Sequence, residues 1–326
     1  MATFTPSQPF KPAPGLTHPH AQTILATVLR PLGTPQVRRE RWETPDGDFL
    51  DVDLLDAPAD RPHVLALHGL EGSSKSGYVR AILRHAAEQG WGALAMNFRS
   101  CSGEPNRIAR SYSSGETDDP RFALGKWRAG GVKGPLFGVG FSLGANVLLK
   151  MLAEDGEGSP LTAAVAISPP FSLAVCARKL DGATGLGRLY REVFLKALKV
   201  KALQKARLHP GAIDPDRVRA ARLLSEFDDA VTAPLYGFKD SAEYYQSCSS
   251  GPLLDRIRRP TLLITSEDDP ITPLNGEHRM QPANPALEWL ITPTGGHVGF
   301  IAGGVGSPHF WAEATATEFL LARTVS

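Results

Sequence analysis

The sequence contains little cysteine and no excess of charge of either sign. Its 326 residues include three cysteines, Cys101, Cys176 and Cys248, and no two of them form a Cys-x-x-Cys pair. Neither a disulfide framework nor a zinc site is therefore indicated, and reduced thiols in a cytosolic setting are expected. The 35 Lys and Arg residues nearly balance the 34 Asp and Glu residues. This balance excludes a polybasic nucleic-acid binder and an acidic tail protein.

Long hydrophobic runs are also missing. No stretch reaches the ~18 consecutive apolar residues that a membrane-spanning helix needs, and residues 1–11 lack the pattern of a secretory signal. Hydrophobic residues nevertheless make up 42% of the chain, which is enough for a real core and excludes disorder. We therefore expect a cytoplasmic protein without stable membrane insertion.

Short apolar strands alternate with helices over much of the chain. Residues 41–55 alternate around Asp46-Gly47, which is typical of a β-hairpin. Buried strands are then predicted at 64–67, 93–97, 136–141, 163–167, 261–265 and 287–291, and helices at 78–89, 143–154 and 311–322. Apolar strands that alternate with helices predict an α/β fold with a mostly parallel sheet covered on both faces.

The alternation stops between residues 171 and 251. This stretch is mostly helical in pattern and rich in Lys and Arg, with helical segments at 187–208 and 215–226. Open parallel sheets bind ligands beyond the ends of their strands, so we interpret 171–251 as a helical cap inserted there. The predicted organisation is an N-terminal arm at 1–35, a core at 36–170 and 252–326, and this cap.

The basic segment 187–208 has two interpretations. A helix with seven Lys and Arg residues could lie on a membrane surface. A solvated outer face of the cap is the more common explanation of such a pattern.

The segment Gly140-Phe141-Ser142-Leu143-Gly144 has the pattern Gly-x-Ser-x-Gly. It directly follows an apolar strand and directly precedes a helix, as a nucleophile elbow requires. The turn is so tight that both flanking positions must be nearly free of side chains, which accounts for the two glycines. The pattern predicts Ser142 as an exposed nucleophile, the alternative being an ordinary N-cap serine.

A serine nucleophile needs a histidine base that a carboxylate orients. In elbow-containing folds the order along the chain is serine, acid, histidine. The histidines after the serine are His209, His278, His297 and His309. His297 lies in a Gly-Gly-His-Val-Gly-Phe turn after the last predicted strand, where its ring can reach a nucleophile, and it is the predicted base. His278 is expected on a surface helix, and His309 at a helix start.

The predicted acid is Asp269, in the turn after the strand at 261–265. Asp268 is its main rival, because one residue of slip along an extended segment reverses the direction of a side chain. The remaining alternative is that this segment is an Asp-Pro turn with no catalytic role.

Two backbone N–H groups should stabilise the oxyanion of a tetrahedral intermediate. We assign them to Leu143, which follows the nucleophile, and to Leu70, in the loop after the strand at 64–67. His68 precedes Ser142 in the chain and is interpreted as a structural brace of that loop. Cys101 has no neighbouring histidine in sequence that would make it a reactive thiol.

With these residues in place, the chain resembles the YheT-like branch of the α/β-hydrolase fold, the AB-hydrolase-4 family. The matching segments, which together span residues 10 to 320, are 68–74, 97–103, 112–119, 140–146, 226–229, 244–245, 268–270 and 295–300. The family's Arg-Gly-Cys-x-Gly occurs here with Ser100 in place of the glycine. The resemblance implies an α/β-hydrolase fold, a triad of Ser142, Asp269 and His297, and serine hydrolysis of carboxylic esters.

We therefore expect a cytoplasmic serine esterase that cleaves small or lipid-like esters with short- to medium-chain acyl groups through an acyl-enzyme. No metal or organic cofactor is needed, because the protein supplies the nucleophile, and no nucleic-acid partner is expected. One alternative is an alcohol acyltransferase that uses the same triad. Another is a non-catalytic binding protein that has kept the fold.

Overall fold

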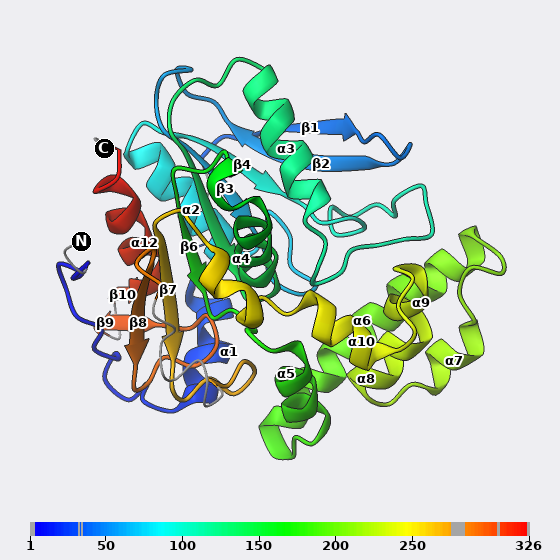
Figure 1. The fold of residues 1–326 in the computed structure, drawn as a ribbon. Coiled ribbons are helices and arrows are strands. Elements are labelled where there is room, and N and C mark those ends of the chain that lie inside the picture. The colour runs from blue at the N-terminus through cyan, green and yellow to red at the C-terminus, as the bar shows by residue number, and fades with distance from the viewer. Residues whose placement is uncertain (1–3, 32, 34, 275–283, 305–306, 325–326) are drawn as a thin grey trace.

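The computed structural model describes the chain apart from residues 1–3, 32, 34, 275–283, 305–306 and 325–326. Its centre is one sheet (Figure 1) whose strands are β1 (Arg38–Glu43), β2 (Phe49–Leu55), β3 (His63–Leu67), β4 (Gly92–Met96), β5 (Leu136–Phe141), β6 (Ala163–Ile167), β7 (Thr261–Ser266) and β8 (Leu287–Thr292). The strand order is β1-β2-β4-β3-β5-β6-β7-β8. β2 pairs antiparallel with both of its neighbours, and all other pairings are parallel. The expected α/β fold with a mostly parallel sheet is confirmed.

The central strands are continuous apolar runs because helices cover both faces of the sheet. Every residue of β3 to β7 is buried. The flanking helices are α2 (Gly77–Glu88), α3 (Asp118–Ala129), α4 (Leu143–Asp155) and α12 (Trp311–Leu321). Alternate residues of β3 enter two separate apolar clusters: Leu65 and Leu67 pack in the cluster with α3 and α4, and Val64 packs in the one with α2 and α12.

The chain between β6 and β7 is helical and contains no strand of the sheet. Its helices, which lie together beside the sheet (Figure 1), are α5 (Leu173–Asp181), α6 (Gly185–Leu208), α7 (Pro215–Ala220), α8 (Leu224–Phe227), α9 (Ala233–Leu235) and α10 (Ser241–Cys248). The single helical segment predicted at 215–226 is wrong, because the chain is extended at Ala221 between α7 and α8. The side chain of Asp181 accepts hydrogen bonds from the backbone N–H groups of Leu224 and Ser225, and this long-range cap starts a new helix.

Two further strands, β9 (Ile301–Gly304) and β10 (Ser307–Phe310), form a small antiparallel hairpin that the sequence did not predict. Four-residue strands that contain Gly-Gly or Pro carry little β-propensity, so their pattern is weak. His309 lies in β10, not at the start of a helix as expected. Next to this hairpin lies α1 (Pro19–Leu29), whose Ala26 packs with Ile301 and Phe310.

Candidate active site

The serine of the Gly-x-Ser-x-Gly pattern lies in a strained turn between β5 and α4. Ser142 has φ 51° and ψ −119°, a backbone conformation that costs a non-glycine residue energy. A Cβ at Gly140 would lie 2.5 Å from the carbonyl oxygen of Gly144, and one at Gly144 would lie 2.4 Å from that of His68. Both glycines are therefore required by the close approach of backbones. The Ser142 side chain does not cap α4, which leaves its hydroxyl free for another partner.

That partner is His297. The Ser142 hydroxyl lies 2.9 Å from Nε2 of His297, and Nδ1 of the same ring lies 2.8 Å from Oδ2 of Asp269. Asp269 follows the end of β7, and His297 lies in the turn after β8. Since both nitrogens of the imidazole are engaged, the ring is oriented to accept a proton from the serine while the carboxylate holds its tautomer. The structure thus brings together the three side chains predicted as a triad.

Asp269 and Asp268 have different environments. Oδ2 of Asp269 also accepts a hydrogen bond from the Thr272 hydroxyl at 2.7 Å, and its Oδ1 accepts one from each N–H of Ile271 and Thr272 at 2.8 Å. Asp268 instead accepts the N–H of Gly296 at 2.9 Å. The first carboxylate contacts the imidazole, and the second holds the glycine turn that carries it.

The turn that carries His297 is held by α1, from the opposite end of the chain. The N–H of His297 donates to the Thr23 hydroxyl at 2.9 Å. The buried side chain of Gln22 bonds both the N–H and the C=O of Ile301, at 2.6 and 3.1 Å. Arg30, which ends α1, donates to the carbonyl of Val298 at 2.5 Å and pairs with Glu313 at 2.8 Å. No sequence pattern pointed to these contacts, since more than 260 residues separate most of the partners.

In the part of the chain that the structure describes, the loop after β3 presents a free backbone N–H, that of Leu70, near the serine. The N–H of Gly69 donates to the Tyr78 hydroxyl at 3.1 Å, and that of Glu71 donates to the Tyr112 hydroxyl at 2.9 Å. Between them, the N–H of Leu70 has no acceptor within the described residues. The N–H of Leu143, at the start of α4, is likewise free of any acceptor in the described part of the chain. These are the two donors that the sequence predicted for the oxyanion.

The same loop is bound to a helix of the insertion between β6 and β7. The Glu71 carboxylate accepts hydrogen bonds from the Tyr112 hydroxyl at 2.8 Å and from Nζ of Lys201 at 3.0 Å. Glu71 itself has φ 57°. Lys201 belongs to α6, so this ion pair fixes the loop that carries Leu70 against a helix of the insertion.

His68 has a structural role, because both of its ring nitrogens bind backbone groups. Its Nδ1 bonds the carbonyl of Gly69 at 2.7 Å, and its Nε2 accepts the N–H of Phe98 at 3.1 Å. Burial lowers the pKa of His68 to about 4, so the ring is neutral at physiological pH. Both ring nitrogens are occupied by backbone, as a brace of the loop requires.

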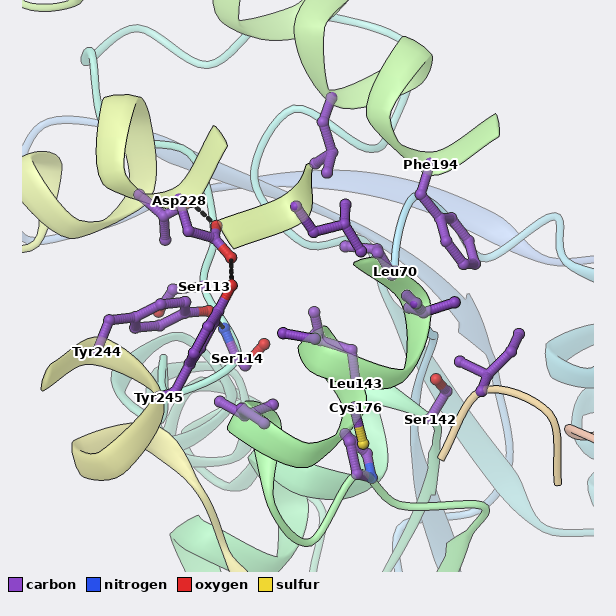
Figure 2. A pocket seen from close by; sticks show the side chains of 18 of the residues that line it. Leu70, Ser113, Ser114, Ser142, Leu143, Cys176, Phe194, Asp228, Tyr244 and Tyr245 are labelled. Carbon is purple, nitrogen blue, oxygen red and sulfur yellow. Dashed lines mark hydrogen bonds between the residues drawn. The ribbon is translucent and has the colours of Figure 1, made fainter. Parts of the chain in front are cut away.

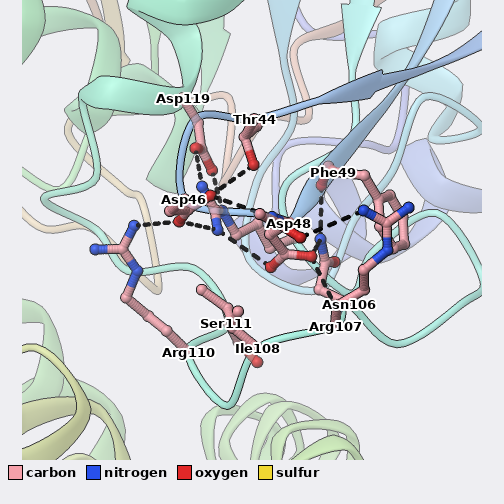
Figure 3. A network of polar contacts seen from close by, with 12 residues as sticks. Thr44, Asp46, Asp48, Phe49, Asn106, Arg107, Ile108, Arg110, Ser111 and Asp119 are labelled. Carbon is pink, nitrogen blue, oxygen red and sulfur yellow. Dashed lines mark hydrogen bonds and ion pairs between the residues drawn. The ribbon is translucent and has the colours of Figure 1, made fainter.

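Arg99 binds three carboxylates, those of Asp46, Asp48 and Asp119, which belong to a larger polar network (Figure 3). The Arg99 guanidinium bonds Asp119 at 2.6 and 2.8 Å, Asp46 at 2.7 Å and Asp48 at 3.1 Å. It therefore joins the turn of the β1–β2 hairpin to the start of α3. Ser100 adopts φ 64°, the left-handed conformation that glycine adopts without strain.

Cys101, in the same segment, is not activated as a nucleophile. Its sulfur lies 3.2 Å from Nζ of Lys201. Burial nevertheless outweighs this cation and raises the pKa of the Cys101 thiol to about 11. The thiol is therefore protonated at neutral pH.

A cavity of about 130 Å³ lies between Ser142 and the helices of the insertion. Its lining is mainly apolar and includes Leu70, Leu143, Leu173, Leu180, Phe194, Leu198 and Leu224. Figure 2 shows Ser142 on one side of this cavity and Asp228 with Tyr245 on the opposite side. The Asp228 carboxylate accepts hydrogen bonds at 2.6 Å from the hydroxyls of Tyr245 and Thr232, and burial raises its pKa to about 6.

Tyr245 separates this cavity from an outer groove. The groove, of about 750 Å³, is lined by residues of α5 and α10 together with neighbouring loops. Ala177 and Tyr245 line both spaces. The Tyr245 ring, held by its hydrogen bond to Asp228, is therefore part of the wall that closes the cavity opposite Ser142.

Among the described residues, no helix combines the length and apolar character needed to cross a membrane. Within the same part of the chain, no group of three or more His, Cys, Asp or Glu side chains is arranged to hold a metal ion. His278, a candidate base in the sequence, lies outside the described residues.

Comparison with known proteins places the chain in a family. Residues 62–303 match the sequence profile of the family described as the alpha/beta hydrolase fold. The chain belongs to the α/β-hydrolase family. Its YheT-like character is also borne out: it is 37% identical to YheT of Escherichia coli (strain K12), an esterase candidate by name, over 97% of this chain and 94% of that protein. It is 29% identical to human phospholipase ABHD3 over 85% of this chain and 71% of that protein.

Solved structures of esterases share the fold. The esterase Pf2001 of Pyrococcus furiosus aligns with a TM-score of 0.57 at 18% identity, over 90% of this chain and 98% of that one. Est1E of Butyrivibrio proteoclasticus, solved with ferulic acid, aligns with a TM-score of 0.60 at 14% identity, over 88% of this chain and all of its own (100%). These two likenesses show the fold, while the family match and the similarity to YheT support a hydrolase of the esterase and lipase type.

Proposed function

We propose that this α/β-hydrolase is a serine esterase that cleaves carboxylic esters through an acyl-enzyme. Ser142 attacks the ester carbonyl while His297 takes its proton. Asp269 holds the imidazole in the tautomer that has a free Nε2 and stabilises the imidazolium that forms. His297 then returns the proton to the leaving alcohol. A water molecule, activated by the same histidine, hydrolyses the acyl-enzyme.

The observation that carries this proposal is the continuous pair of hydrogen bonds from Ser142 through His297 to Asp269, at 2.9 and 2.8 Å. Such contacts are what a general base needs in order to act on a serine hydroxyl. The N–H groups of Leu70 and Leu143, which have no acceptor among the described residues, support an oxyanion site, because they are fixed backbone donors next to the nucleophile.

The cavity suggests the substrate. Its mainly apolar lining suits an acyl chain, and a volume of about 130 Å³ is comparable to the ~150 Å³ cavity that holds a benzene molecule. We therefore propose small or lipid-like esters with short- to medium-chain acyl groups. The helices at 171–251 would act as a cap that supplies much of this lining, over a core at 36–170 and 252–326 with an N-terminal arm at 1–35.

Three free, buried cysteines support a reducing compartment, and we propose the cytoplasm. One observation also favours acyl transfer to an alcohol as a second activity. The chain is 26% identical, over 90% of its length and 68% of the relative's, to a yeast protein named medium-chain fatty acid ethyl ester synthase/esterase 2. Adding ethanol to the esterase assay measures this activity as the fraction of acyl groups recovered as ethyl ester.

The test is Ser142→Ala, assayed with p-nitrophenyl butyrate. Without the nucleophile, kcat/KM should fall by about 10³-fold or more. A fluorophosphonate probe should label the wild type and not the variant. Ser7→Ala, at an exposed serine of the N-terminal arm, is the matched control and should retain full activity and labelling. Near-normal hydrolysis by Ser142→Ala would overturn the proposed mechanism.

A further inference from the structure

The outward face of α6 carries a stripe of apolar side chains. Leu186, Leu189, Val193, Val200 and Leu208 are exposed by 50, 49, 56, 62 and 54% respectively. Successive members are three, four, seven and eight residues apart, so they lie along one side of the helix. Isolated exposed leucines and valines are ordinary, but five of them along one side of a single helix mark an interaction surface. We call these five residues the α6 stripe.

The α6 stripe is not needed to hold the helix in place. The opposite face of α6 packs inward: Leu195 and Ala202 are buried in an apolar cluster of the insertion. Phe194 (Figure 2) and Leu198 line the cavity next to Ser142. The helix therefore has two apolar faces, one that forms the candidate active site and one that is open to the surroundings.

The charge of α6 indicates what the stripe contacts. The helix carries seven Lys or Arg residues and one Glu. Lys196 lies three residues from Val193 and four from Val200. This spacing places Lys196 on the stripe itself. Lys196 and Arg207 are exposed and make no ion pair within the described residues. Their charge is therefore available to an external partner.

We propose that the α6 stripe docks this protein on a lipid surface that bears anionic headgroups. The apolar side chains would enter the boundary between headgroups and acyl chains, while Lys196 and Arg207 would contact the negative headgroups. A second copy of the chain fits less well, because two such helices face to face would bring like charges together. The docking rests on the proposed function, since it would place the cavity lined by Phe194 and Leu198 next to lipid-like esters.

Co-sedimentation with vesicles tests the docking. The wild type should bind vesicles of phosphatidylcholine mixed with phosphatidylglycerol, and bind pure phosphatidylcholine more weakly, with less binding at high salt. The double variant Leu189→Glu/Val193→Glu should lower the binding constant about tenfold or more. Lys196→Gln/Arg207→Gln should lower it about fivefold for each charge removed. Leu321→Glu changes another exposed leucine, at the end of α12, and should bind as the wild type does.

Three results would overturn the docking. One is a wild type that does not bind the mixed vesicles, and another is a double Glu variant that binds them as well as the wild type. The third is a wild-type dimer in solution that the double variant dissociates, since it would assign the stripe to a second copy. Should the Glu variant fail to fold, the charge variant carries the same test. Ser142→Ala should bind like the wild type because binding needs no turnover, so the docking and the esterase proposal can fail separately.

Discussion

Replacement of Asp269 and of Asp268 by asparagine should have very different effects on the proposed reaction. In Asp269→Asn, an amide group facing His297 would favour the tautomer with its proton on Nε2, which cannot accept the proton of Ser142. The loss of kcat should therefore approach 10⁴-fold, about 5 kcal/mol of transition-state stabilisation. In Asp268→Asn, the side-chain oxygen that accepts the N–H of Gly296 remains. Its replacement should cost about 1 kcal/mol and less than about tenfold in kcat.

The assay is steady-state hydrolysis of p-nitrophenyl butyrate by both variants, with thermal unfolding measured in parallel. Asp269 also accepts three hydrogen bonds from Ile271 and Thr272, so some loss of stability is expected with Asp269→Asn. Activity is therefore compared at a temperature where both variants are folded. An equal loss of kcat in the two variants, or a larger loss in Asp268→Asn, would refute the assignment of the acid.

Three further predictions concern the surroundings of the triad. Thr23→Val leaves the N–H of His297 without its acceptor, so the free energy of unfolding should fall by about 1–3 kcal/mol in denaturant titrations. The kcat of this variant should also fall. The control Thr17→Val, outside α1, should change neither the stability nor kcat. Tyr245→Ala opens the wall between the cavity and the outer groove. The p-nitrophenyl ester with the highest kcat/KM should therefore have a longer acyl chain for this variant than for the wild type. An unchanged preference for acyl-chain length would show that Tyr245 does not limit the length of the acyl group. Burial raises the pKa of Asp228 from 3.8 to about 6, so the folded state binds this proton more tightly than the unfolded state. The stability that this group contributes should be present below pH 4 and fall by up to about 3 kcal/mol as the pH rises from 4 through 6. Asp228→Asn should remove this part of the pH dependence, and identical slopes in the two proteins would contradict it.

Much of the sheet could be predicted from the sequence, because its strands are buried on both faces and their residues are apolar almost without interruption. The strand at 136–141 and the strand at 163–167 agree with β5 and β6 to the residue. The positions of Ser142, Asp269 and His297 were also accessible, because each one follows a strand of a parallel sheet and such strands end at the same edge. Their catalytic roles stay predictions.

The features that could not be predicted from the sequence depend on contacts between residues far apart in the chain, and such contacts leave no periodic pattern. Asp181 caps α8 from another helix, and Thr23 holds His297 from near the N-terminus. Neither side chain differs in sequence from an ordinary surface residue. The difference between Asp268 and Asp269 is of the same kind, since only the three-dimensional path of the turn decides which carboxylate meets the imidazole.

The support of the His297 turn by α1 has a consequence for biosynthesis. Gln22 and Thr23 are synthesised before the Ile301 and His297 segments that they bind, more than 270 residues later in the chain. A nascent chain therefore carries its nucleophile long before it has a working base. The proposed hydrolase would stay inert until residues 297–301 have been synthesised and have met α1.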